Sequence, residues 1–156
     1  MSLYFDDLEV GATYEAGPIT MERDRIIAFA SEFDPQPMHV DEVAATAGPL
    51  GGLIASGWHT AAVTMRLLVD GALPRLAEGA VGAGMEAMAW PTPVRPGDVL
   101  RARSEIVELR PSRSRPDRGL MKLRTTTTRA DGAVVQTITA VIMVPRRLVP
   151  QPGAET

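Results

Sequence analysis

The stretch Ser56–Leu73, SGWHTAAVTMRLLVDGAL, decides the fold of this chain. Ser56 suits an N-cap, because its side-chain oxygen can accept a hydrogen bond from a free N–H group of the first helical turn. The residues that follow are apolar on nearly every side of a helix, so we expect this helix to be buried. Gly71 and Pro74 end it, since neither residue suits a helix interior. Another layer of structure must therefore cover the helix.

The chain beyond residue 80 is expected to supply that layer. Four long β-prone runs follow one another there: Val81–Trp90, Val99–Leu109, Leu120–Arg129 and Val134–Val144. Asp131-Gly132, between the last two runs, is a strong hairpin signal. A long helix followed by antiparallel strands predicts an α+β fold in which the sheet wraps around the helix. Other two-layer α+β folds fit the same pattern.

The first half of the chain is expected to be mainly helical. Thr13–Ile19 suits a short opening strand. Thr20 is a candidate N-cap for a helix that ends before Pro35, because the residue preceding a proline avoids helical geometry. Asp41 is a candidate N-cap for a second, short helix that ends at Ala47.

The overall composition limits the classes of function. The chain has 156 residues, and we expect a single domain over residues 1–156 with a flexible tail from about residue 146. The net charge of -3 argues against a nucleic-acid partner. No signal peptide is visible, and no apolar segment is long enough to suggest a membrane protein. The absence of cysteine and the presence of only two histidines argue against disulfides and a metal site, and the composition fits a reducing cytoplasm.

The stretch Phe33–Asp41, FDPQPMHVD, carries the candidate chemistry. Asp34 and His39 lie five positions apart with two prolines between them, and each residue before a proline is driven toward extended geometry. A stiff loop of this kind can hold a carboxylate and an imidazole at a fixed separation, as general acid–base catalysis requires. The imidazole also titrates near neutral pH. On these residues alone, a helix-ending turn followed by a histidine that only packs or caps also fits.

The segment Phe33–Glu42 resembles the signature of the MaoC-like dehydratases, the (R)-specific enoyl-CoA hydratase group. That signature has an aspartate, then usually Asn-Pro, then an apolar residue and a histidine. Asp34 and His39 match its two catalytic positions. Gln36 stands where the family usually has Asn, and both residues are amides.

Two further segments agree with this resemblance. Ile54–Gly57 resembles the turn that opens the family's central helix, and Pro93–Asp98 resembles a turn before a long strand. Over about Phe5–Val144 the resemblance implies a hot dog fold, in which an antiparallel sheet wraps a long helix. The implied reaction is the reversible addition of water to a trans-2-enoyl thioester, which gives an (R)-3-hydroxyacyl thioester. Asp34 would remove a proton from the water, and His39 would orient the water and supply a proton at C2.

The same resemblance implies that the substrate is a thioester of coenzyme A or acyl carrier protein, with no separate cofactor. The thioester oxygen gains negative charge as the enolate forms and needs preorganised donors. The first turn of the helix after Ser56 offers free N–H groups and the positive end of the helix dipole. We therefore expect Gly57, with Ser56 and Trp58, to bind the substrate, because glycine permits close approach to the backbone. Alternatively, Ser56 is only an N-cap and Gly57 only permits tight packing, and His59 is expected to pack or cap.

Two other functions remain open on this scaffold: a hot dog thioesterase and a non-catalytic acyl-binding protein. A thioesterase needs a water-activating group aimed at the carbonyl carbon, often from the central helix, and only Asp70 and Glu42 lie near that helix in the sequence. The pair formed by Asp34 and His39 favours hydration. A single hot dog unit leaves a sheet edge open, so we expect a homodimer with the site near its interface.

Overall fold

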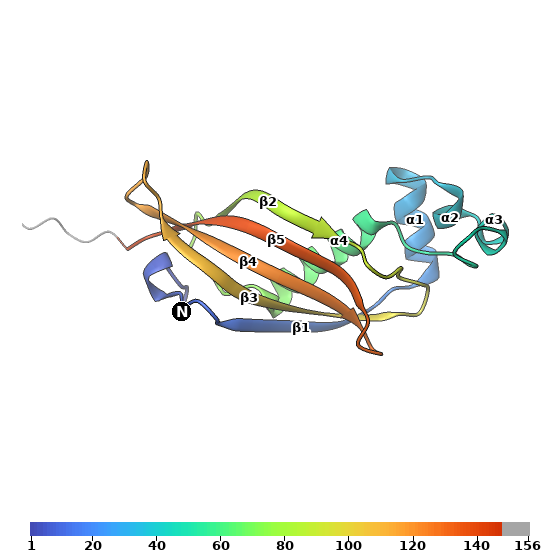
Figure 1. Cartoon of the computed structure of the whole chain (residues 1–156), viewed down its shortest axis with the longest axis horizontal. Helices are drawn as coiled ribbons and strands as arrows, with labels where there is room; N and C mark the ends of the chain where they lie inside the picture. Colours follow the sequence, from blue (N-terminus) through green and yellow to red (C-terminus); the bar gives the residue numbers. More distant parts are fainter. Residues whose placement is uncertain (148–156) are drawn as a thin grey trace, which may run out of the picture.

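A five-stranded antiparallel sheet wraps one side of a central helix in the computed structural model, which describes residues 1–147 (Figure 1). The strands lie in the order β1-β3-β4-β5-β2, and each neighbouring pair is antiparallel. Their bounds are β1 Thr13–Thr20, β2 Val81–Ala89, β3 Val99–Pro111, β4 Arg118–Arg129 and β5 Val134–Pro145. The central helix is α4, Gly57–Leu67, and a π-helical turn, Leu68–Ala72, continues it. The predicted α+β arrangement, with a sheet around a long helix, is confirmed.

Alternate residues of the strands face α4 and form the core. In β3, Leu100, Ala102 and Ile106 are buried, whereas the residues between Leu100 and Ser104 that alternate with them are exposed. This period of two follows from the pleat of a strand. Leu67 of α4 belongs to the same apolar cluster as these strand residues. One face of the sheet is therefore apolar and packs on the helix.

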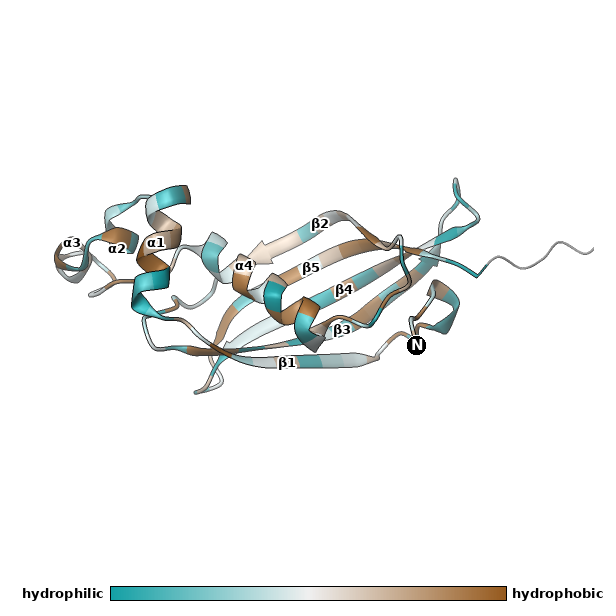
Figure 2. Ribbon diagram, turned by 180° about the vertical axis from the view of Figure 1, so that it is seen from behind, coloured by the Kyte–Doolittle hydropathy of each residue, from teal (hydrophilic) through white to brown (hydrophobic). Residues whose placement is uncertain are grey.

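Helix α4 is buried on one side only, so in the single chain its predicted burial holds for that side and not for the other. Trp58 and Met65 of α4 are 60% and 57% exposed, and Val69 of the π-helical turn is 70% exposed. Figure 2 shows α4 in front of the sheet, which covers only its rear. The neighbouring edge strand β2 is also exposed along nearly its whole length, including Val81 and Met85. The apolar pattern of α4 thus predicted a covering layer. The sheet of the same chain covers one side of the helix, and the other side is exposed.

Three helices precede α4 and lie together beyond one end of the sheet (Figure 1). Their bounds are α1 Arg23–Phe33, α2 Pro37–Val40 and α3 Glu42–Ala47, and a 3-10 turn η1 covers Phe5–Asp7. The predicted cap Asp41 is confirmed, because its carboxylate accepts from the backbone N–H groups of Val43 and Ala44. The predicted cap Thr20 is wrong, because Thr20 is the last residue of β1 and α1 begins after it. Helix α2 was not predicted, although Pro37 suits its first turn, where a residue without an N–H group loses no intrahelical hydrogen bond.

The last described residues are tied to the start of the chain. Arg146 pairs with Asp6 at 2.8 Å, and Arg147 pairs with Asp7 at 2.7 Å. The remainder of the predicted flexible tail lies outside the described residues. Within residues 1–147, no helix has the length and apolar character needed to cross a bilayer. In the same range, no cluster of His, Cys, Asp or Glu side chains is placed to hold a metal ion.

Candidate active site

Asp34 and His39 lie side by side, with 3.4 Å between His39 Nε2 and Asp34 Oδ2. Asp34 follows the last residue of α1, where its backbone N–H donates to the carbonyl of Ala30. Pro35 then turns the chain away, and His39 comes from the short helix α2. The imidazole is 5% exposed and the carboxylate 19% exposed, so the pair is shielded from bulk water but not sealed.

A backbone carbonyl fixes the tautomer of His39. Its Nδ1 lies 2.8 Å from the carbonyl oxygen of Ile54. A carbonyl can only accept a hydrogen bond, so Nδ1 carries a proton and the neutral ring presents a lone pair at Nε2. That lone pair faces the ionised carboxylate of Asp34. Two acceptors at this separation are bridged either by one shared proton or by a water molecule that donates to both.

Two hydrogen bonds hold the Asp34 carboxylate. Gln36 Nε2 donates to Oδ1 at 2.7 Å, and Ser56 Oγ donates to Oδ2 at 2.7 Å. These two bonds, the one from Gln36 first, lower the pKa of Asp34 below its ordinary value, because they favour the charged form. The positive charge of a protonated His39 acts in the same direction. Asp34 is thus an ionised base at neutral pH, and the amide at position 36 supports it.

Ser56 joins the start of α4 to this carboxylate. Its hydroxyl accepts from the backbone N–H of Trp58 at 3.2 Å and donates to Asp34. It is therefore the N-cap of α4, as predicted, and its side chain is fully buried. With both roles of the hydroxyl filled, the Ser56 side chain positions Asp34 and does not face the cleft.

The pair and the start of α4 both line an open cleft of about 450 Å³. We call it the α4 cleft. Its lining includes Asp34, His39, Gly57, Trp58, Trp90 and Val135. Within residues 1–147 the backbone N–H of Gly57 makes no hydrogen bond, so it is free to donate into the cleft. A Cβ atom at Gly57 would lie 2.6 Å from Cε2 of Trp90, so glycine is also required for packing here.

The second histidine lies on another side of α4. The ring of His59 stacks on Phe29 of α1 with 4.8 Å between centroids and 8° between planes. Its Nδ1 is buried without a hydrogen-bond partner among the described residues. Burial, and secondarily the charge of Arg25, lower the pKa of His59 below its ordinary value. His59 therefore packs, as expected, and lines a separate hollow that does not include Asp34 or His39.

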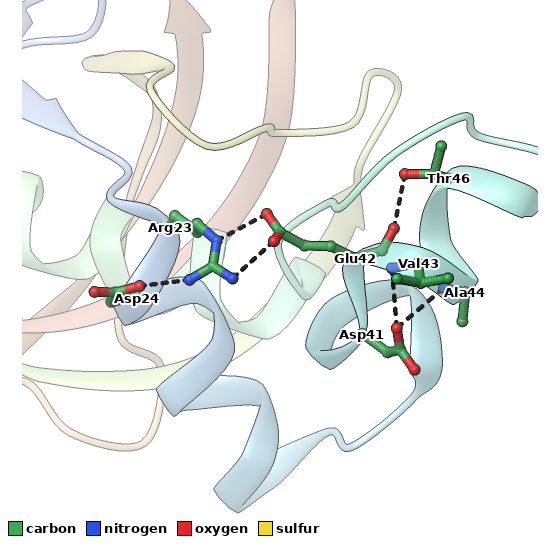
Figure 3. Close-up of polar contacts among 7 residues, drawn as sticks. All are labelled: Arg23, Asp24, Asp41, Glu42, Val43, Ala44 and Thr46. Carbon is green, nitrogen blue, oxygen red and sulfur yellow. Dashed lines mark hydrogen bonds and ion pairs between the residues drawn. The ribbon is translucent and has the colours of Figure 1, made fainter.

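An ion pair outside the cleft links α1 and α3, the helices on either side of Asp34 and His39. Arg23 of α1 donates two hydrogen bonds to Glu42 of α3, at 2.8 and 2.7 Å (Figure 3). Such a bidentate contact fixes the relative orientation of the two side chains. Asp34 and His39 lie between these two helices in the sequence. The ion pair between Arg23 and Glu42 thus limits movement of α1 relative to α3, the helices that flank Asp34 and His39.

Comparison with known proteins assigns the chain to a family. A family model described as a MaoC like domain matches residues 7–129. This chain belongs to the MaoC-like dehydratase family. The crystal structure of a MaoC-like dehydratase from Rhodospirillum rubrum superposes with a TM-score of 0.88 at 49% identity, covering 95% of this chain and 100% of that one. The predicted hot dog fold is therefore confirmed.

Two curated proteins are similar to most of the chain, and the name of the first agrees with this assignment. A 3-hydroxybutyryl-CoA dehydratase from Methylorubrum extorquens is 36% identical over 114 residues, which cover 72% of this chain and 69% of that protein. The protein YdeM of Bacillus subtilis is 34% identical over 115 residues, which cover 70% of this chain and 77% of YdeM.

Sequence reasoning missed one contact of the site. No motif marks Trp90, which follows β2 and lines the cleft. The bond from Ser56 to Asp34 joins residues 22 positions apart, and it exists only because α4 begins beside the end of α1. The pattern around Ser56 predicted an N-cap, in which a lone pair of the hydroxyl accepts a hydrogen bond and the hydroxyl proton stays free to donate. That free proton is the only feature of the sequence that pointed to the bond from Ser56 to Asp34.

Proposed function

We propose that this MaoC-like protein is a hydratase/dehydratase that adds water reversibly to a trans-2-enoyl thioester and gives an (R)-3-hydroxyacyl thioester. The observation that carries the proposal is the 3.4 Å approach of His39 Nε2 and Asp34 Oδ2 in the lining of the α4 cleft. Two acceptors so placed are suited to hold one water molecule by its two protons. The relative named 3-hydroxybutyryl-CoA dehydratase supports this class of substrate.

The proposed step uses Asp34 and His39 as one proton-transfer unit. The water oxygen forms a bond to C3 of the enoyl group while one of its O–H bonds breaks and the proton passes to the pair. The electrons of the double bond move to C2 and the thioester oxygen, and a proton from the pair then forms the C2–H bond. The free N–H of Gly57, at the positive end of the α4 dipole, stabilises the charge on that oxygen.

A second copy of this chain is the partner that fits the exposed apolar surface. Trp58 and Met65 on α4 and Val81 and Met85 on the edge strand β2 are the exposed apolar side chains concerned. Pairing of β2 edges would satisfy the open backbone groups and cover α4. We include a homodimer in the proposal, and a monomeric mass in light scattering at micromolar concentration would count against it. We include a cytoplasmic location in the proposal, and the absence of cysteine is compatible with that reducing compartment.

The hydrolase alternative finds less support in the geometry. Asp70 pairs with Arg66 on the outside of α4, at 2.9 Å. Glu42 is engaged by Arg23. Neither carboxylate lines the α4 cleft, so neither is aimed at a thioester carbonyl bound there. A purely acyl-binding role does not require the carboxylate–imidazole pair of Asp34 and His39.

The test is to mix the protein with crotonyl-CoA and follow enoyl absorbance, with a thiol reagent in parallel. We expect enoyl absorbance to fall with no release of free thiol. Asp34→Asn should lower kcat/KM by about 10²–10⁴-fold, because an amide cannot accept the proton. Asp24→Asn is the matched control, since Asp24 is exposed on α1 and, within residues 1–147, Arg23 is its one side-chain ion-pair partner. Thiol release, or an Asp34→Asn variant as active as the control, would overturn the proposal.

A further inference from the structure

The indole of Trp90 forms the wall of the α4 cleft next to the first residue of α4. Its six-membered ring lies so close to Gly57 that an added Cβ would come within 2.6 and 2.7 Å of Cε2 and Cδ2. Trp58 meets the same indole edge-on, with ring centroids 5.5 Å apart. Thr60 and Val135, which are almost fully buried, also line the cleft. The ring therefore stands where the cleft meets the packed interior.

A buried chain of hydrogen bonds holds this ring in place. Trp90 Nε1 donates to Gln136 Oε1 at 2.7 Å, and Gln136 Nε2 donates to Thr64 Oγ1 at 2.9 Å. Thr64 Oγ1 lies 2.8 Å from Thr127 Oγ1. Gln136, Thr64 and Thr127 are all inaccessible to solvent. Every link is satisfied, and a buried amide that loses its partner is costly, so the network resists any rotation of the indole.

Such a network is more than packing requires. An apolar side chain at residue 136 would fill the same space under α4 without needing partners, and buried polar groups stabilise a fold only when they are all paired. The network fixes the orientation of the indole: its N–H group points to Gln136, and its ring packs against Gly57. Trp90 remains 42% exposed in the single chain, and it directly follows the edge strand β2.

We propose that Trp90, positioned by Gln136 and Thr64, closes the inner end of the α4 cleft and restricts the enzyme to short acyl chains. This inference rests on the proposed hydratase function. The acyl chain extends from the reacting carbons at Asp34 and His39 toward Val135. The indole stops it before it can pass between α4 and β5. Trp90 is the specificity-determining residue, and Gln136 is a positioning residue that acts through it.

The experiment measures binding and turnover separately. Calorimetry gives the affinities for butyryl-CoA, octanoyl-CoA and lauroyl-CoA, which are saturated and cannot take up water. Enoyl absorbance gives kcat/KM for crotonyl-CoA, octenoyl-CoA and dodecenoyl-CoA. For Trp90→Ala we expect the ratio of octanoyl-CoA to butyryl-CoA affinity to rise by about 10-fold or more, since each methylene accommodated in an apolar pocket counts strongly. Trp90→Phe, which keeps most of the ring, should leave the preference for butyryl-CoA in place.

Two further variants separate positioning from loss of stability. Gln136→Leu removes the indole's acceptor without touching the cleft lining, and should shift the ratio in the same direction as Trp90→Ala. In a Trp58→Phe background Trp90 is the sole tryptophan, so its fluorescence should show a more mobile indole when Gln136→Leu is added. Met121→Ala is the control, because Met121 is a fully buried core residue outside the cleft lining. It should lower the melting temperature and leave the chain-length ratio unchanged.

The outcomes are distinct. A parent protein that prefers lauroyl-CoA, a Trp90→Ala variant with an unchanged ratio, or an equal shift in Met121→Ala would each overturn the inference. If the Trp90→Ala variant is active and its chain-length preference is unchanged, the role of Trp90 is overturned and the hydratase proposal is retained. Length-dependent binding that shifts in Trp90→Ala, with no turnover of any enoyl thioester, sinks the hydratase proposal and supports the role of Trp90.

Discussion

The two histidines of this chain are almost equally buried, at 4% and 7% exposure, yet their surroundings differ completely. His39 has a backbone carbonyl at Nδ1 and a carboxylate beyond Nε2. His59 has an aromatic ring against its face and an Nδ1 without a partner among the described residues. One ring is oriented by polar groups at both nitrogens, and the other is held by stacking.

The contrast shows that burial alone does not make a histidine functional. His59 behaves as an aromatic packing residue whose charged form is disfavoured, since burial lowers its pKa. His39 is fixed in one tautomer with a lone pair aimed at a cleft, which is the property that proton transfer needs. The difference arises from local structure, because α2 turns His39 toward the start of α4, whereas His59 leaves α4 on the side of α1.

The largest expected effect comes from the same substitution at both histidines. His39→Asn keeps an amide that can donate to the Ile54 carbonyl but removes the base, so kcat/KM for crotonyl-CoA should fall by about 10²–10⁴-fold. His59→Asn should leave kcat/KM close to that of the parent, because His59 lies outside the α4 cleft. Steady-state kinetics on the two variants make the comparison. Equal losses of activity would mean that the distinction between the two sites is false.

Much of this contrast was accessible from the sequence. The spacing of Asp34 and His39 and the two prolines between them predicted a fixed carboxylate–imidazole pair, and the structure brings the two side chains together. The position of His59 in the first turn after Ser56 predicted a packing or capping role, and the structure shows packing. The short helix α2 was missed, because proline-rich segments favour extended geometry and only the tertiary contacts of His39 select the helical turn.

Other parts of the molecule depend on contacts that no local pattern encodes. The hairpin at Asp131-Gly132 was predicted, and Gly132 does adopt a φ of 86° there. The bonds from Ser56 to Asp34 and from Trp90 to Gln136 join distant segments, so they require the folded arrangement of α1, α4 and the sheet. The apolar pattern of α4 predicted burial but could not say that the sheet covers one side only.

An intermediate effect should follow from Ser56→Ala. This substitution removes a hydrogen bond to Asp34, the carboxylate beside His39, and leaves the histidine unchanged. Loss of the Ser56 hydrogen bond should raise the pKa of Asp34 toward its ordinary value, since that bond lowers it. Loss of the N-cap should lower the free energy of unfolding by about 1 kcal/mol. With the carboxylate less well placed, kcat should fall, by less than about 10²-fold, while KM changes little.

Carboxyl NMR gives the pKa of Asp34 in this variant, and kinetics with crotonyl-CoA gives kcat and KM. Ser56→Thr is the control, because threonine retains the hydroxyl that donates to Asp34 and caps α4. An Asp34 pKa that is the same in the alanine and threonine variants would show that Ser56 does not support the carboxylate in solution.

The smallest expected effect is a pH dependence of stability that belongs to His59. Burial places its pKa in the folded state below the 6.5 expected for an unfolded chain. Between those two values the unfolded state binds more protons, so the free energy of unfolding should decrease as pH falls below about 6.5 and be greatest above it. Asp34 and Glu42, whose lowered pKa values start from 3.8 and 4.5, lose their contributions only at lower pH.

Urea unfolding across this range, in the His39→Asn background so that His59 is the only titrating imidazole, isolates the effect. Adding His59→Phe should flatten the profile, because phenylalanine can stack on Phe29 without a proton to lose. If the slope survives in that variant, it does not come from His59. If the slope is absent from the start, the Nδ1 of His59 finds a partner in solution, and the two histidines differ less than their contacts indicate.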